Sequence, residues 1–124
     1  MKWDCLRGEI YYIDFGEGIG SEQKGARPAL VVQNNIGNKF STTTIVAAIT
    51  TKEKNREKHI PTHYTIGGIC GLKKQSVVLL EQIRTVEKNR ITGYIGKLTD
   101  NQMKEIDNLI HISIGLNCKK EEEK

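Results

Sequence analysis

The sequence predicts a mainly β protein of one small domain, with a single helix near the C-terminus. Short runs of β-branched and aromatic residues recur along most of the chain, turn residues separate them, and one helical repeat follows. The chain has 124 residues, which suits one domain. We place that domain at residues 1–117 and expect residues 118–124 to be a charged, frayed tail. Short strands followed by a terminal helix suggest a small, strongly bent β-barrel that the helix covers at one end.

Five segments have the pattern of strands, at residues 7–15, 29–33, 43–49, 61–66 and 76–86. The third is continuously apolar, as in a buried strand. In the last segment, alternation predicts Gln82 and Arg84 on one face and Glu81, Ile83 and Thr85 on the other.

Two stretches predict breaks between strands. Residues 16–25 contain four glycines, and so many glycines in ten positions predict a long loop. The asparagines and the glycine of residues 34–38 predict a turn. Loops longer than a hairpin connection are uncommon in compact domains and often carry function.

The helix is marked at both ends. Thr99 and Gln102 form a capping box, and Leu98 and Met103 have the spacing of a hydrophobic staple. Gly115 predicts the end of the helix. The residues at helical spacing are expected to be core residues: Met103, Ile106, Leu109, Ile110 and Ile114.

Composition excludes several classes of protein. Hydrophobic residues make up 37% of the chain, and there are also 12 glycines, which is enough apolar surface for a folded core. The longest apolar run, residues 45–49, is far below the ~20 residues of a membrane span. The first residues lack the apolar segment of a secretion signal. We therefore expect a cytoplasmic protein with no membrane partner.

The cysteines and histidines indicate neither disulfides nor a metal. The chain has three cysteines, at positions 5, 70 and 118, which is an odd number and includes no CxxC pair. Among the histidines, Pro61 separates His59 from His63, so these two do not share a helix face, and we place His111 at the helix surface. No GxxxxGK[ST] loop is present. We expect reduced thiols, no metal and no cofactor.

Four polar residues next to apolar strands are candidates for a functional site. Arg27 follows the glycine-rich loop at the start of a strand, and a guanidinium held by a strand suits a phosphate. Thr50 ends an apolar strand, while Gln82 and Arg84 interrupt one. Taken singly, these residues also fit a surface ion pair, a strand end and an edge hydrogen bond. Together they suggest a polar groove for nucleic acid. The net charge of +4 permits this partner without identifying it.

Ordered motifs along the chain resemble the MazF/PemK toxins. The matching strings are Arg7-Gly8-Glu9-Ile10-Tyr11, Gly20-Ser21-Glu22-Gln23, Arg27-Pro28, Val31-Val32-Gln33-Asn34, Ile45-Val46-Ala47-Ala48-Ile49-Thr50 and Leu79-Leu80-Glu81-Gln82-Ile83-Arg84-Thr85. They occur in the family's order and cover roughly residues 6–116.

The resemblance implies an SH3-like β-barrel that forms a homodimer. It also implies the toxin of a type II toxin–antitoxin pair, an mRNA interferase that cuts single-stranded mRNA without a metal. Arg27 and Thr50 match the family's catalytic pair. The RNA-binding positions match Ser21, Glu22, Gln23, Glu81, Gln82 and Arg84. A MazE-like antitoxin would insert an acidic segment into the same groove, and members similar in pattern prefer a UACAU-type site.

Elementary chemistry is compatible with these roles. RNA is cut without a metal if its 2′-hydroxyl attacks the adjacent phosphorus, provided that the extra charge is stabilised. The Arg27 guanidinium can bond two phosphate oxygens, and Thr50 can donate one hydrogen bond. Arg27 is a poor general base because its pKa exceeds ~12. Glu22 is an acid placed by sequence to take a proton, and the general acid and base stay unassigned.

Two other classes of function remain open at this stage. Gyrase-directed relatives of the same fold are non-enzymatic poisons, which would need a contact surface at the helix. A non-catalytic RNA-binding barrel would bind RNA in a salt-dependent manner and leave it intact.

Overall fold

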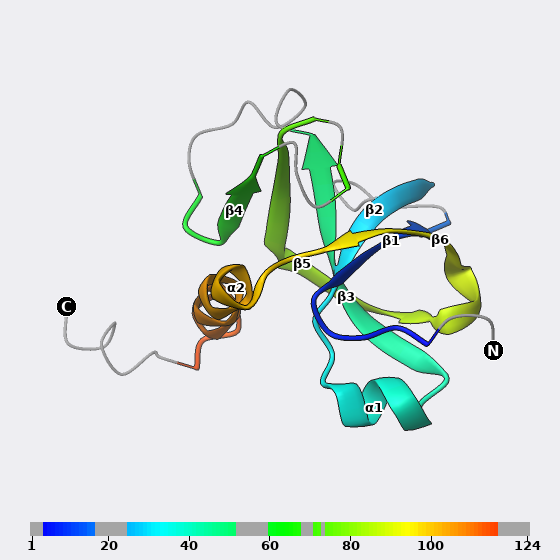
Figure 1. Ribbon diagram of the computed structural model, residues 1–124. Coiled ribbons are helices and arrows are strands. Elements are labelled where there is room, and N and C mark those ends of the chain that lie inside the picture. The colour runs from blue at the N-terminus through cyan, green and yellow to red at the C-terminus, as the bar shows by residue number, and fades with distance from the viewer. Residues whose placement is uncertain (1–3, 17–24, 52–59, 68–70, 73, 117–124) are drawn as a thin grey trace.

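The computed structural model describes residues 4–16, 25–51, 60–67, 71–72 and 74–116. The expected mainly β domain with a helix near the C-terminus is confirmed (Figure 1). The elements are β1 (Glu9–Asp14), β2 (Ala26–Val31), α1 (Asn35–Phe40), β3 (Thr43–Thr51), β4 (His63–Ile66), β5 (Ser76–Glu87), the 3₁₀ turn η1 (Lys88–Arg90), β6 (Ile91–Lys97) and α2 (Asp100–Ser113).

The strands form one antiparallel sheet in the order β4-β5-β3-β2-β1-β6. The expected strongly bent sheet is present, but it is not closed, because β4 and β6 do not pair. Its edges are β4, which has four residues, and β6. Other parts of the chain cover this gap in place of a ladder. Helix α2 packs against β4 and β5 (Figure 1). Gly71 lies against the backbone of Ile95 in β6.

Apolar clusters fill both faces of the sheet. Ile10, Leu30 and Ala47 are opposite one another on β1, β2 and β3 and share a cluster with Ile106 of α2. We call this side the α2 face. The alternate residues, which include Ile13 and Ala29, form a second cluster with Phe15. We call that side the Phe15 face.

Helix α2 has the predicted boundaries. The Thr99 hydroxyl accepts from the Gln102 backbone N–H at 3.1 Å, and the Gln102 side chain accepts from the Thr99 N–H at 2.8 Å. This is the predicted capping box. Leu98 and Met103 both belong to or pack against the α2-face cluster. In the part of the chain that the structure describes, no helix has the length and apolar character required to cross a membrane.

Two elements differ from the sequence predictions. Residues 34–38 were expected to be a turn, but Asn34 accepts a 2.7 Å hydrogen bond from the Gly37 N–H and starts helix α1. The buried Asn38 joins this helix to β3, because its side chain accepts a hydrogen bond from the Thr44 hydroxyl at 2.7 Å. Strand β6 was not predicted, because its two glycines and mostly half-buried or exposed residues give no clear alternation.

Strand β5 contains a large bulge. Ala48 of β3 is opposite Leu79, whereas the preceding residue, Ala47, is opposite Ile83, so residues 80–82 have no partner on β3. Leu80 and Ile83 both pack in the α2-face cluster although they are three positions apart. The predicted alternation therefore holds for residues 83–85 but not across the bulge to Glu81 and Gln82. Such bulges bend a strand and redirect side chains.

Candidate functional site

The structure places Arg27 and Thr50 on adjacent central strands. In the β2–β3 ladder Ala29 is opposite Ala48, and continuing this register by two residues sets Arg27 opposite Thr50. Side chains directly opposite each other on antiparallel strands point to the same face, with Cβ atoms about 4.5–5.5 Å apart. Both residues are half-buried and lie on the Phe15 face. Two residues far apart in the sequence are thus brought together, and both line one pocket.

Rigid neighbours hold both positions. Arg27 is paired on its other side with the fully buried Ile13 of β1. Thr50 is paired with the buried Val77 of β5. The guanidinium and the hydroxyl therefore project from residues whose backbones are each paired with a buried neighbour. A guanidinium and a hydroxyl fixed in this way can donate hydrogen bonds to the oxygens of a phosphate.

Arg84 joins these residues on the Phe15 face. It is opposite Val46 in the β3–β5 ladder, and its guanidinium lies over the Phe15 ring, 5.1 Å from the ring centroid. Phe15 is buried, and its N–H donates to the Gly25 carbonyl at 2.9 Å, next to the start of β2. The cation–π contact therefore directs the Arg84 charge toward the side of the sheet that carries Arg27.

The glycine-rich loop is closed at its base. The Gly25 N–H donates to the Gly16 carbonyl at 2.8 Å, and both glycines have a positive φ, 71° and 74°. This conformation suits glycine and closes the loop directly before Arg27. The predicted RNA-binding residues Ser21, Glu22 and Gln23 lie outside the described residues, and their roles stay predictions.

Glu81 and Gln82 lie in the β5 bulge. Glu81 contacts two residues at the start of β4: Thr62 Oγ1 donates to Glu81 Oε1 at 2.8 Å, and His63 Nε2 lies 2.8 Å from Glu81 Oε2. Gln82 is half-buried. The contact of Glu81 with Thr62 and His63 was not predicted from the sequence, because nothing in the local sequence reveals the β4–β5 register.

A pocket of about 250 Å³ opens beside the Arg27–Thr50 pair. It is lined by Tyr12, Arg27, Pro28, Ile49, Thr50, Thr51, Gly71, Leu72, Lys74 and Ser76. Tyr12 is opposite Pro28 and therefore alternates with Arg27, so the pocket lies at the ends of these strands and takes residues from both faces. Tyr12, whose side chain is exposed, and Lys74 were missed from the sequence. The sequence signal for Tyr12 was the alternation of side chains along β1, which puts Tyr12 on the opposite face from the buried Tyr11.

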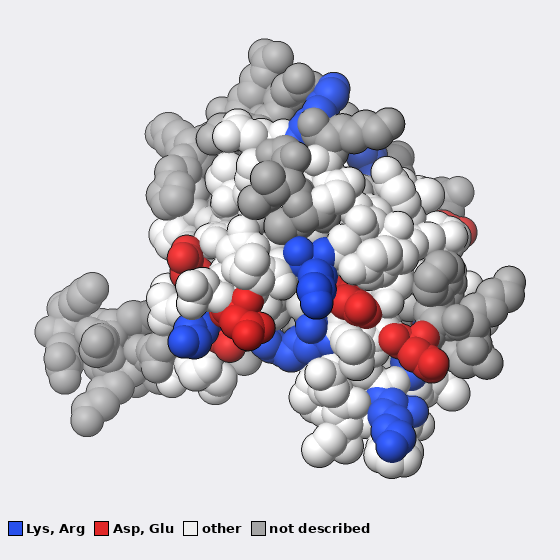
Figure 2. Space-filling model, in the orientation of Figure 1, with Lys and Arg blue, Asp and Glu red and all other residues white. Residues whose placement is uncertain are grey.

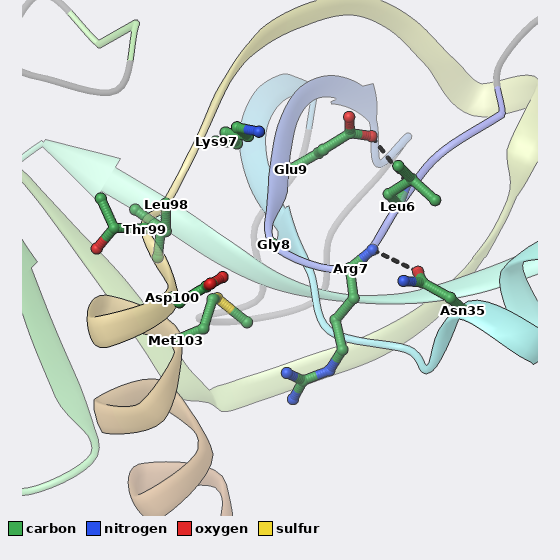
Figure 3. A pocket seen from close by; sticks show the side chains of 10 residues that line it. All are labelled: Leu6, Arg7, Gly8, Glu9, Asn35, Lys97, Leu98, Thr99, Asp100 and Met103. Carbon is green, nitrogen blue, oxygen red and sulfur yellow. Dashed lines mark hydrogen bonds between the residues drawn. The ribbon is translucent and has the colours of Figure 1, made fainter.

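A second pocket, of about 330 Å³, has a structural role (Figure 3). It lies between β1 and the start of α2 and contains none of the predicted site residues. Arg7 points from its rim toward α2, where Nη2 lies 2.6 Å from the Asp107 carboxylate, and Nε donates to the Val32 carbonyl at 2.8 Å. The Arg7 N–H also donates to the Asn35 side chain at 2.7 Å. These contacts join the N-terminal segment to both helices.

One side of the molecule carries charges of both signs. On the side of the molecule seen in Figure 2, Lys and Arg side chains lie beside Asp and Glu side chains and form no continuous basic area.

The cysteines and the remaining histidines have no position at the candidate site or lie outside the described residues. Cys5 is buried, and burial raises the pKa of its thiol, although a hydrogen bond with Thr44 acts in the opposite direction. His111 is exposed on α2, as expected. Cys70, Cys118 and His59 lie in undescribed segments. Among the described residues, no group of three or more His, Cys, Asp or Glu could hold a metal ion.

Comparison with known proteins gives this arrangement a family. A protein-family model described as PemK-like, MazF-like toxin of type II toxin-antitoxin system matches residues 6–114. The chain belongs to this family.

Relatives are similar over most of their length. The chain is 47% identical over 111 residues to endoribonuclease EndoA of Bacillus subtilis (strain 168), which covers 89% of this chain and 94% of that protein. It is 50% identical over 111 residues to endoribonuclease MazF of Staphylococcus saprophyticus, covering 89% and 91%.

Solved structures share the fold. A mycobacterial endoribonuclease in complex with its cognate antitoxin is 28% identical, has a TM-score of 0.73, and covers 90% of this chain and 96% of that chain. MazF from Deinococcus radiodurans is 22% identical, with a TM-score of 0.76 and coverage of 92% and 99%. The chain thus has the fold of these solved structures.

Proposed function

We propose that this chain is the toxin of a type II toxin–antitoxin system and a sequence-specific endoribonuclease that cleaves single-stranded mRNA without a metal. Such cleavage would inhibit translation and growth. The observation that carries the proposal is the Arg27–Thr50 pair, in which a guanidinium and a hydroxyl face each other on two rigid strands. The relatives that are about half identical to this chain, both named endoribonucleases, support the same activity.

The pair suits attack by the RNA's own 2′-hydroxyl. In this reaction a bond forms between the 2′-oxygen and phosphorus, and the bond from phosphorus to the 5′-oxygen breaks. The 2′-hydroxyl gives up its proton, and the leaving 5′-oxygen gains one. Two N–H groups of Arg27 bind the two non-bridging phosphate oxygens as negative charge develops, and the Thr50 hydroxyl donates to one of the same oxygens. The products are a 2′,3′-cyclic phosphate and a 5′-hydroxyl.

The proton donor and acceptor are a separate part of the proposal. Arg27 stays protonated at neutral pH and therefore acts through its charge and hydrogen bonds. Glu22, in the loop whose closed base precedes Arg27, supplies a carboxylate of the type that takes up a proton. Arg84, Glu81 and Gln82, with Ser21 and Gln23 of the loop, contact the RNA on either side of the cut.

The decisive experiment examines the ends of the cleaved RNA. The purified chain is incubated with a single-stranded RNA pool in EDTA, and the product ends are determined by ligation-based sequencing. We expect 5′-hydroxyl and 2′,3′-cyclic phosphate ends. Arg27→Ala should lower turnover by more than ~100-fold, as the loss of a transition-state donor does. Products with a 5′-phosphate, or a requirement for Mg²⁺, contradict the mechanism. Intact RNA together with trapped gyrase would favour a non-enzymatic poison instead.

The proposed partners follow from the family. We propose a MazE-like antitoxin whose acidic segment occupies the RNA groove, a homodimer in solution, and a cytoplasmic location. A site that binds phosphate oxygens can also bind carboxylates, because cationic donors form hydrogen bonds with both kinds of anion. Light scattering of the chain alone and with an acidic antitoxin peptide checks the first two, and the sequenced RNA ends check the UACAU-type preference.

A further inference from the structure

We propose that Thr62 and His63 position the Glu81 carboxylate to read one base of the RNA, so that strand β4 helps to set the cleavage sequence. The inference rests on the proposed RNA substrate and assigns a role to two residues outside the catalytic pair. His63 and Thr62 are positioning residues in this proposal, since they act through Glu81 and do not touch the reacting phosphate.

Because of the β5 bulge, the Glu81 side chain needs contacts outside the β3–β5 ladder to fix its direction. We call its two hydrogen-bond partners, Thr62 and His63, the clamp. Residues 80–82 have no partner on β3, so the ladder does not fix the direction of the Glu81 side chain. The rest of the bulge is tightly held. The Leu80 N–H donates to the Thr62 carbonyl at 3.0 Å, and the Leu80 carbonyl accepts from the Ser113 hydroxyl of α2 at 2.7 Å. The backbone beside Glu81 is thus anchored from two sides.

Thr62 and His63 then fix the carboxylate itself. Each oxygen has its own partner, Thr62 Oγ1 on Oε1 and His63 Nε2 on Oε2, both at 2.8 Å. The His63 side chain is only 10% exposed, whereas that of Glu81 is 37% exposed. A nearly buried donor therefore holds an acceptor that solvent, or a ligand, can still reach.

The ladder places His63 on the same face as the catalytic pair. His63 is opposite Leu79, which is opposite Ala48, two residues along β3 from Thr50. With strands about 4.8 Å apart and a rise of about 3.4 Å per residue, the Cα atoms of His63 and Thr50 are roughly 12 Å apart. A short single strand of RNA bound at Arg27 and Thr50 can span this distance.

The chemistry of a held carboxylate favours a base over the RNA backbone. A carboxylate repels phosphate, but it accepts hydrogen bonds from the exocyclic amino groups of cytosine or adenine. It has about four lone-pair positions, of which Thr62 and His63 occupy two. Because the clamp removes the rotamer freedom that an exposed glutamate would lose on binding, it makes the contact stronger and more selective.

The test compares sequence preference among variants. The wild-type site is first read from a random RNA pool, and short RNAs that carry each of the four bases at each position of that site are then assayed for kcat and KM. We expect the preference for the wild-type base over the other three bases to fall about tenfold in both Glu81→Gln and His63→Leu, at the same single position of the RNA site. The loss should appear in KM, with kcat within about twofold of wild type.

Further variants separate positioning from a general loss of structure. His63→Gln retains an N–H donor near the place of Nε2 and should restore most of the discrimination. The double variant of His63→Leu and Glu81→Gln should lose no more than either single variant. His111→Leu, the same substitution at an exposed position on α2, is the matched control and should keep the wild-type profile. Thermal unfolding of each variant verifies the fold.

Several results would overturn the inference. An unchanged profile in His63→Leu, a uniform loss over all RNAs, or effects at a different position from Glu81→Gln each exclude the positioning role. If the wild type cleaves no RNA, the proposed function fails instead. The same variants are then compared by sequencing the RNAs that they retain from the pool, and an identical retained set in all of them excludes base reading by Glu81.

Discussion

Replacing Thr50 by valine tests the proposed catalytic pair with very little change of shape. Valine has nearly the volume of threonine and an equal preference for strands, so Thr50→Val removes the hydroxyl alone. Thr50 is half-buried between β2 and β5, and its strand neighbour Val77 is buried. We therefore expect the free energy of unfolding to change by less than about 1 kcal/mol.

The effect on cleavage should be much larger than the effect on stability. The backbone at Thr50 is paired with the buried Val77 of β5, so a small shift does not bring another donor into the place of the lost hydroxyl. Loss of one fixed donor to a developing oxyanion typically costs about 100- to 1000-fold in kcat. Arg27 still supplies its charge in this variant, so we expect a kcat about 100-fold below wild type, with KM little changed.

The assay is single-turnover cleavage of one RNA that contains the wild-type site, followed on a gel in EDTA. Thr85→Val is the matched control, because Thr85 is exposed on β5 opposite Ile45, five residues along β3 from Thr50. The control should cleave like the wild type. A Thr50→Val variant that retains more than a third of the wild-type rate, or a control that loses as much as Thr50→Val, refutes the assignment of the hydroxyl.

Two further predictions concern the fold. Gly71→Ala should lower the free energy of unfolding in urea by at least about 2 kcal/mol, because φ is +89° and a Cβ would overlap the Ile95 carbonyl. Gly67→Ala is the control, with open space around the added Cβ, and should change this free energy by less than about 0.5 kcal/mol. Equal losses in the two variants would contradict this account of the sheet edge. Burial and a 2.6 Å hydrogen bond to Glu9 raise the pKa of Tyr11 above its unfolded value near 10, so its stabilising effect is present below pH 10 and is lost as the pH rises beyond it. Urea unfolding between pH 8 and 11 should therefore show a steeper loss for wild type than for Tyr11→Phe, and parallel curves would exclude this cause.

Local signals predicted the elements that depend on neighbouring residues. The capping box of Thr99 and Gln102 was correct because all its partners lie within one turn of helix. Five of the six strands were found because each has its own apolar pattern. Strand β6 and helix α1 were missed, since β6 obtains its structure from β1 and α1 is held by the buried Asn38 and its contact with Thr44 of β3.

The candidate site divides in the same way. Arg27 and Thr50 were named from the sequence, through their place after a glycine-rich loop and an apolar run and through the family resemblance. The contact of Glu81 with Thr62 and His63 was not, because it depends on a bulge that no spacing rule predicts. Tyr12 and Lys74 line the pocket beside Arg27 because the fold brings their segments together.

By itself the sequence determined the mainly β class, the terminal helix, the family and the residue types that suit phosphate chemistry. These properties follow from local propensity, burial pattern and ordered motifs, which are readable along one dimension. The tertiary structure alone decided that the sheet stays open, that Arg27 faces Thr50, and that Glu81 is directed by β4. Strand register and bulges arise from pairing between distant segments, and the free energy of that pairing depends on all the strands together.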